Sequence, residues 1–160
     1  MKWKGPSVYP KILFTAATAL FVLFIFHNSM FPGPQSGAQS QTVMHFVNQL
    51  LASCNIPYAF TEHFIRKAGH FTEYFIFGVL LALTLRAYRC EGLEFVFAQG
   101  FFLLLVPACD ELIQLFTPER GSSVADIFLD FCGGVVGTVV CCLFLFRSAK
   151  KRRSVHRFGR

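Results

Sequence analysis

The stretch VADIFLDFCGGVVGTVVCCLFLF, residues 124–146, decides the fold. A helix needs about 20 mostly apolar residues to cross the hydrocarbon core of a bilayer, and this stretch supplies them without a Lys or Arg. Three further windows have the same character, at about residues 12–31, 68–88 and 92–109. We therefore predict an all-α, polytopic membrane protein whose membrane domain, residues 12–146, is a four-transmembrane-helix bundle.

The composition of the whole chain agrees with a bilayer as its solvent. Of the 160 residues, 54% are hydrophobic and 15% are charged, whereas about 25% of residues are charged in a typical soluble domain. The mean hydropathy is +0.50. These values exclude an intrinsically disordered chain and argue against a water-soluble globule, which could not cover so much apolar surface.

The distribution of Lys and Arg predicts the orientation. With the N-terminus inside, twelve of the fifteen basic residues lie in the cytoplasm, and the other three, Arg66, Lys67 and Arg120, lie outside. Cytoplasmic loops carry such an excess of basic residues. Both termini, residues 1–11 and the basic tail 147–160, are therefore predicted to be cytoplasmic. A basic tail beside a span contacts anionic lipid, so we expect membrane lipid and no nucleic acid as its partner.

The first span has a second interpretation, as a signal peptide with a small-residue cleavage site at Ser36-Gly37-Ala38. That site lies well past Phe26, where the continuous apolar run ends. Cleavage would leave three spans in the same orientation, so both interpretations place the same polar residues outside.

The outer segment between the first two spans begins with a breaker-rich stretch, residues 32–37, which predicts a loop. Apolar residues then recur at helical spacing, at Val43, Phe46, Val47, Leu50 and Leu51. This pattern predicts a short amphipathic helix at the outer face that ends at Pro57 and forms a lid, a membrane anchor or a binding helix.

Near the same face, Cys54 and Cys109 could pair in an oxidising compartment.

Polar residues gather at three places that the predicted topology puts at the outer end of the bundle. Ionisable residues at membrane depth are costly and usually mark a function or a partner. One group opens the second span, the next closes the third span, and the last leads into the fourth span. In this order they are Arg66, Lys67, His70, Glu73 and Tyr74; Asp110, Glu111 and Gln114; and Arg120, Asp126 and Asp130.

Three local patterns predict how these residues are presented. Asp126 and Asp130 share a helix face with Gly133 and Gly137, whose lack of side chains lets a neighbouring span approach the aspartates closely. Pro107 is predicted to weaken the third helix, so that the carboxylates after it turn toward a cavity. Ser122 or Ser123 is predicted to cap the fourth helix.

Three interpretations of an outward-facing pocket built from these residues stay open. In the first, Arg66, Lys67 and Arg120 bind a phosphate or carboxylate of a lipid-linked or peptide ligand. In the second, the protein is a membrane-embedded hydrolase or transferase in which Glu111, with His70 and Asp126, supplies a general base. In the third, the charges only pair with one another and hold the helices together.

A metal is a further alternative within the catalytic interpretation. His70 and Glu73, three residues apart, could hold a divalent metal together with Glu111 or Asp126 from other helices. The sequence carries neither a phosphate-binding loop nor a metalloprotease helix motif. We therefore assign no metal and no cofactor from the sequence.

At these residues the chain resembles the VanZ-like family of small bacterial membrane proteins. The family pattern combines Arg-Lys-x-x-His-x-x-x-Tyr with Asp-Glu-x-x-Gln-x-Phe-x-Pro-Gly-Arg and Asp-x-x-x-Asn-x-x-Gly-x-x-x-Gly. The chain matches it over about residues 60–145, with Glu119 in place of Gly and Asp130 in place of Asn. The family is named for a member linked to teicoplanin resistance, so the resemblance implies a protein of the bacterial cytoplasmic (inner) membrane that acts at the envelope.

The residues and the resemblance together predict action at the outer face, on an envelope component or a lipoglycopeptide antibiotic. The expected partner is membrane lipid, a lipid-linked cell-wall precursor or the lipoglycopeptide. The expected ligand-binding residues are Arg66, Lys67, Glu73, Tyr74, Asp110, Gln114, Arg120 and Asp130. Glu111, His70 and Asp126 would carry out any catalysis.

Overall fold

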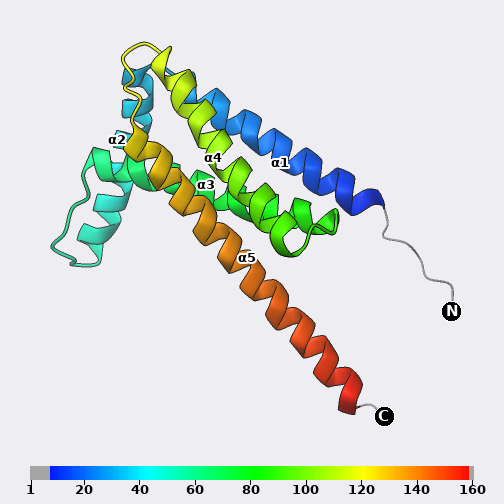
Figure 1. Ribbon diagram of the computed structural model, residues 1–160. Coiled ribbons are helices and arrows are strands. Elements are labelled where there is room, and N and C mark those ends of the chain that lie inside the picture. The colour runs from blue at the N-terminus through cyan, green and yellow to red at the C-terminus, as the bar shows by residue number, and fades with distance from the viewer. Residues whose placement is uncertain (1–7, 159–160) are drawn as a thin grey trace.

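The computed structural model describes the backbone of residues 8–158 and the side chains of residues 8–145, and within that range it contains helices and no strands. The helices are α1 (Val8–Ser29), α2 (Gly33–Ser53), α3 (Glu62–Ala87), α4 (Gly92–Leu115) and α5 (Val124–Phe158) (Figure 1). Four segments are long and apolar enough to cross a membrane, namely α1, α3, α4 and Val124–Leu145 of α5. The predicted all-α, four-span architecture is therefore confirmed.

The packing of α3 against α5 is the most extensive contact between two helices. A Cβ atom at Gly133 or Gly137 would meet the backbone carbonyl oxygen of Phe71 or Phe75, respectively. A Cβ atom at Gly78 would likewise meet the carbonyl oxygen of Gly134. The predicted small-residue face of the fourth span is thus confirmed, because its glycines lie directly against the backbone of α3.

The third spanning helix continues past the end of its apolar window. α4 runs without interruption through Pro107 to Leu115, so the proline does not break the helix. Two turns after the proline, Gln114 Nε2 donates to Asp110 Oδ2 at 2.9 Å and to Ser29 Oγ on α1 at 3.3 Å. Proline removes only one backbone hydrogen bond, and these buried side-chain contacts stabilise the turns that follow it.

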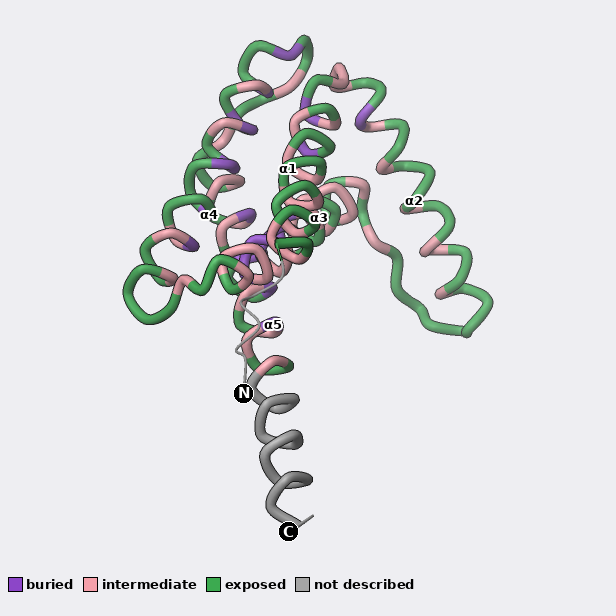
Figure 2. The backbone as a smooth tube through the Cα atoms, turned by 90° about the vertical axis from the view of Figure 1, so that its right-hand side faces the viewer, coloured by how far each residue is buried: buried purple, intermediate pink, exposed green. Residues whose placement is uncertain are grey.

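α2 is the predicted amphipathic helix, and it is longer than the apolar pattern indicated. The stretch expected to be a loop forms its first turn, with Pro32 as the N-cap residue. The loop prediction is wrong here because proline fits the first turn of a helix, where the backbone N–H has no partner in any case. α2 ends at Ser53, before Pro57, and stands to one side of the bundle against α3 (Figure 2).

The connection from α2 to α3 is held by a side chain on the polar face of α2. Asn48 Nδ2 donates to the carbonyl oxygen of Phe60 at 3.0 Å, and Asn48 Oδ1 accepts from the backbone N–H of Phe60 at 2.8 Å. Thr61 then caps α3, its hydroxyl accepting from the N–H of Phe64 at 3.3 Å. α3 therefore begins at Glu62, ahead of its apolar window, and carries Arg66 and Lys67 on its first two turns.

Two parts of the orientation prediction lie outside the described residues. These are Lys2 and Lys4 near the N-terminus and the basic side chains of the tail, residues 147–160. The backbone of α5 is described as one helix to Phe158. α1 begins and α5 ends at the same end of the bundle (Figure 1).

The glycine contact predicts a specific loss of stability. Gly137→Ala is expected to lower the free energy of unfolding by about 1–3 kcal/mol, because its methyl group has no room beside Phe75. Gly100→Ala on α4 is the matched control, since a Cβ atom there meets nothing within 4 Å. Unfolding of both variants in detergent measures the difference, and equal stabilities would contradict the close α3–α5 approach.

Candidate functional site

The polar residues meet at one end of the bundle, where α1 and α4 finish and α3 and α5 begin; we call it the polar end. Two cavities lie there, of about 270 and 220 Å3. The first is bounded by α1, α2 and α3, and the second by α3, the α4–α5 loop and the start of α5. Arg66, His70 and Arg120 line both cavities, so these three residues form the boundary between them.

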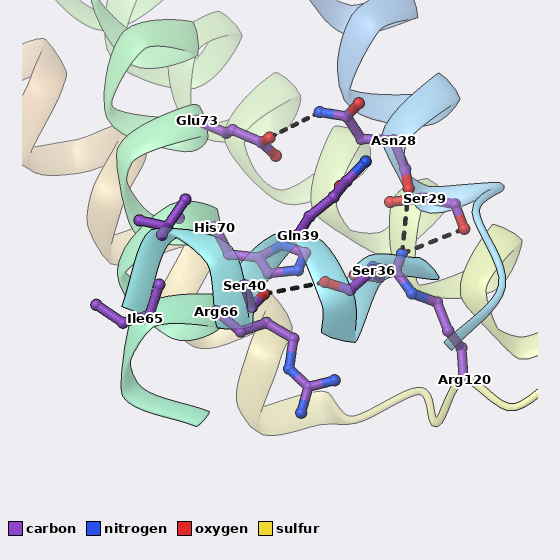
Figure 3. A pocket seen from close by; sticks show the side chains of 12 residues that line it. Asn28, Ser29, Ser36, Gln39, Ser40, Ile65, Arg66, His70, Glu73 and Arg120 are labelled. Carbon is purple, nitrogen blue, oxygen red and sulfur yellow. Dashed lines mark hydrogen bonds between the residues drawn. The ribbon is translucent and has the colours of Figure 1, made fainter. Parts of the chain in front are cut away.

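Arg120 ties the end of α1 to the start of α2 (Figure 3). Its guanidinium donates to the carbonyl oxygen of Ser29 at 3.2 Å and to Ser36 Oγ at 2.6 Å. Carbonyls at a helix C-terminus lack intrahelical partners and carry partial negative charge, which explains this placement. Burial lowers the pKa of Arg120 from its ordinary value, while the carboxylate of Asp110 opposes that shift. The guanidinium remains protonated.

Lys67 and Arg66, adjacent in sequence, have different partners. Lys67 Nζ forms an ion pair with Asp126 Oδ1 across the α3–α5 contact. Arg66 has a looser pair with Glu62 one turn back, at 3.8 Å, and its side chain is 38% exposed. Lys67 is thus engaged in holding two helices together, whereas Arg66 retains donors that face the cavities.

Glu73 lies on the α1 side of the first cavity. Its Oε1 accepts a hydrogen bond from Asn28 Nδ2 at 2.9 Å (Figure 3). Ser36 and Ser40 of α2 line the wall opposite α3. Glu73 therefore contributes an acceptor to this cavity.

Three acids of α4 and α5 are buried and line neither cavity, whereas Asp126 lines the second cavity. Asp110 and Asp130 are 0% exposed and Glu111 is 2% exposed. Glu111 Oε2 accepts from the backbone N–H of Ser123 at 2.7 Å, so this carboxylate orients the residue before α5. Of the two predicted caps the structure selects Ser123, whose hydroxyl accepts from the N–H of Ala125 at 3.2 Å.

His70 faces Asp130 across the α3–α5 contact. The distance from His70 Nδ1 to Asp130 Oδ2 is 4.0 Å, and the His70 side chain is 18% exposed. Tyr74, one turn further along α3, is fully buried. The predicted catalytic trio is therefore divided: His70 faces Asp130, Asp126 pairs with Lys67, and Glu111 bonds to Ser123. Gln114 donates to Asp110 and to Ser29 of α1.

The sequence reasoning did not identify the polar side chains of α1 and α2 that complete the first cavity. Asn28 and Ser29 lie at the end of an apolar span, and Ser36 lies in the supposed loop. Neutral polar residues are common at such positions, so spacing alone carries no signal for them. Their hydrogen bonds with Glu73 and Arg120 identify them only in three dimensions.

An apolar groove of about 590 Å3 adjoins the first cavity between α1, α2 and α3. It shares Val43, Ile65, Gly69 and Glu73 with that cavity. Phe21, Phe24 and Ile76 line its remainder, and all three belong to spanning helices. The first cavity thus continues into an apolar groove lined by side chains of two spanning helices.

The α4–α5 loop contains Glu119, which stands where the VanZ-like pattern has Gly. Glu119 has a φ of 56°, a left-handed conformation that favours glycine and costs other residues about 1 kcal/mol or more. Its carbonyl oxygen lies where a Cβ atom of Gly33 would be, and Gly33 N–H donates to Pro118 O at 3.1 Å. The loop therefore keeps a glycine-like turn and packs against the start of α2 without a glycine at position 119.

Comparison with known proteins identifies one family. The family model described as VanZ/LLP1 matches residues 14–146. No curated protein and no solved structure matches the chain. The matched range includes three spanning segments in full, α1 from residue 14 onward, and all of the polar residues at the polar end.

The pairing of Lys67 with Asp126 predicts a charge-swap rescue. Lys67→Glu or Asp126→Lys alone is expected to lower the free energy of unfolding by on the order of 1 kcal/mol, because like charges then face each other. The double variant restores an opposite pair and should recover most of that loss. Thermal unfolding in detergent measures the effect, and additive losses in the double variant would contradict the pairing.

Proposed function

The chain belongs to the VanZ/LLP1 family, and from this premise we propose that it binds an anionic, lipid-linked ligand at the polar end. The ligand would be an envelope component carrying a phosphate or carboxylate, or a lipoglycopeptide antibiotic. The proposal rests chiefly on one observation, the presence of Arg66 and Arg120 on the walls of both cavities. Four helices able to span a membrane agree with such a multi-pass protein.

The electrostatics of the two arginines support an anionic ligand. Arg120 donates to carbonyl and hydroxyl oxygens, and among the described residues no carboxylate lies within ion-pair distance of it. Its positive charge is therefore not neutralised by direct contact. Arg66 has only its exposed pair with Glu62. Guanidinium groups bind phosphate and carboxylate through paired N–H donors, so the two side chains suit either anion.

The apolar groove supports a lipid chain on the same ligand. Its Phe and Ile side chains lie on α1 and α3, and it opens from the wall of the first cavity at Glu73 and Gly69. A ligand with its anionic head in the cavity could place an acyl or isoprenoid chain along this groove. Burial of apolar chain surface contributes about 25 cal/mol per Å2, so the chain would add substantially to the affinity.

We also propose that the polar end faces outward from the bacterial cytoplasmic membrane. Arg86 and Arg89 lie at the other end of the bundle, beside the α3–α4 turn. The excess of basic residues in the tail favours the same orientation. Both termini would then be cytoplasmic and the cavities would open to the outer leaflet.

Catalysis on the same ligand is a second candidate function. The observation that favours it is the position of His70, which lines both cavities and faces the buried carboxylate of Asp130. Such a pair could move a proton at a bound phosphate ester. Asp126 and Glu111 are engaged in other contacts, so this version assigns the proton transfer to His70 with Asp130.

Binding of farnesyl phosphate tests the proposal. Purified protein in nanodiscs is expected to bind farnesyl phosphate more tightly than farnesol, which lacks the charge, or inorganic phosphate, which lacks the chain. Arg66→Gln should weaken that binding about tenfold or more, the effect of losing a charge-assisted hydrogen bond. Arg86→Gln, at the far end of α3, is the matched control and should change nothing.

The farnesyl phosphate experiment can contradict the proposal, and competition with teicoplanin extends it. Equal affinity for farnesol and farnesyl phosphate, or equal loss in both variants, would exclude anion binding at the polar end. Displacement of farnesyl phosphate by teicoplanin would extend the ligand class to a lipoglycopeptide. Absence of displacement would restrict it to lipid-linked envelope components.

Labelling of two native cysteines tests the proposed orientation. Cys54 is exposed after α2 at the polar end, and Cys90 lies in the α3–α4 turn; Cys54 and Cys109 are both free thiols. In intact spheroplasts, a membrane-impermeant maleimide should label Cys54, and it should label Cys90 only after permeabilisation. Cys54→Ser and Cys90→Ser identify each signal. Labelling of Cys90 first would reverse the proposed orientation.

A further inference from the structure

Three potential metal ligands from three different helices converge beneath the cavities. His70 comes from α3, Asp110 from α4 and Asp130 from α5. One ligand atom of each residue lies within 4.8 Å of the corresponding atoms of the other two. Two ligands on one cation at about 2.1 Å each are at most about 4.2 Å apart. Small side-chain movements would therefore bring all three onto one ion.

The ligand atoms are buried and have no other partner in the part of the chain that the structure describes. Both carboxylate oxygens of Asp130 lack a hydrogen bond, as do Asp110 Oδ1 and His70 Nδ1. Asp110 and Asp130 are fully buried. A buried polar atom without a partner is destabilising, and native proteins normally satisfy such atoms with protein groups, water or an ion. These atoms thus point to a ligand shared among the three helices.

The local charge agrees with a divalent cation. Asp110, Asp130 and the neighbouring Glu111 are three buried carboxylates. Among the described residues, Lys67 and Arg66 are paired with Asp126 and Glu62, so Arg120 is the nearby cation without a carboxylate in direct contact. When all three are ionised, they exceed the one guanidinium by two negative charges, and burial makes an uncompensated charge expensive.

We propose that His70, Asp110 and Asp130 bind a divalent transition-metal cation. One imidazole nitrogen with carboxylate oxygens is a mixed donor set, which suits Mn2+ or Zn2+ better than an all-oxygen set would. Glu111 Oε1 and the Tyr74 hydroxyl are buried oxygens that also lack partners among the described residues. The trio differs from the one that the sequence suggested, because Glu73 turns toward Asn28 and Asp126 toward Lys67.

The proposed metal site is accessible from the cavities, and a bound ion there would join three helices. His70 lines both cavities, so an ion could reach it from either one. Because α3, α4 and α5 each provide a ligand, a bound cation would join three spanning helices at the polar end. This proposal does not depend on the ligand assigned to the cavities, since the metal alone is the probe.

Metal binding by the purified full chain tests the site directly. After chelation and readdition of Mn2+ or Zn2+ in detergent, the wild type should bind about one ion per chain, measured by elemental analysis and by the EPR signal of Mn2+. Asp130→Asn keeps the shape of the side chain and removes its charge, so affinity should fall at least about tenfold. Asp126→Asn, one turn away on α5, is the matched control and should bind like the wild type.

The unfolding temperature with and without metal gives a second test, which includes His70→Gln in case Asp130→Asn does not fold. Metal should raise the unfolding temperature of the wild type and of Asp126→Asn, and leave that of Asp130→Asn and His70→Gln unchanged. A wild type that binds neither ion would overturn the proposal and assign the cluster to protonated acids. Equal losses in Asp126→Asn and Asp130→Asn would also overturn it. Binding of farnesyl phosphate is measured separately, so failure of one proposal leaves the other intact.

Discussion

The direct contact of α5 with the backbone of α3 determines where the polar groups of this protein lie. Gly133 and Gly137 lie against the carbonyls of Phe71 and Phe75, and no side chain separates the two helices there. Lipid tails are as apolar as Leu, so helices in a bilayer associate through close packing of this kind and through polar contacts. The contact extends toward the start of α5, where it brings Asp126 to Lys67 and Asp130 to His70. A wider spacing between the helices would break both pairs.

The polar end also shows how the protein satisfies the ends of its helices at membrane depth. The carbonyl oxygen of Ser29 accepts from Arg120 and from the Thr117 hydroxyl at 3.1 Å. The N–H of Ser123 donates to Glu111. Unpaired backbone groups are costly where water is scarce, and here the side chains of the α4–α5 region provide the partners. Several residues that resemble a binding site in sequence are thus partly structural, and the arginines that line the cavities combine both roles.

The burial of three carboxylates carries an energetic cost that is concentrated at one place. Asp110, Glu111 and Asp130 come from two helices and face a histidine from a third. A chain under selection for stability alone would replace such groups by apolar residues, since buried charges are often dispensable for folding. Their position behind two cavities, next to an apolar groove, links the cost to the ligand and metal proposals rather than to helix packing.

The number of spans, the all-helical class and the glycine face follow from the sequence itself, because apolar length and small-residue spacing act locally along one helix. The same holds for α2, except at its start. Residues 32–37 were predicted to be a loop, but proline is compatible with the first turn of a helix, and α2 begins at Gly33. The sequence also predicts that the ionisable residues lie together at one end of the bundle, because the order of the spans decides which helix ends meet. It could not assign partners among them: Lys67 pairs with Asp126 rather than a ligand, Glu111 accepts from the N–H of Ser123, and His70 faces Asp130. Those choices depend on the rotation and separation of three helices, and the roles of Asn28, Ser29 and Ser36 depend on the position of Arg120, so only the tertiary structure decided them.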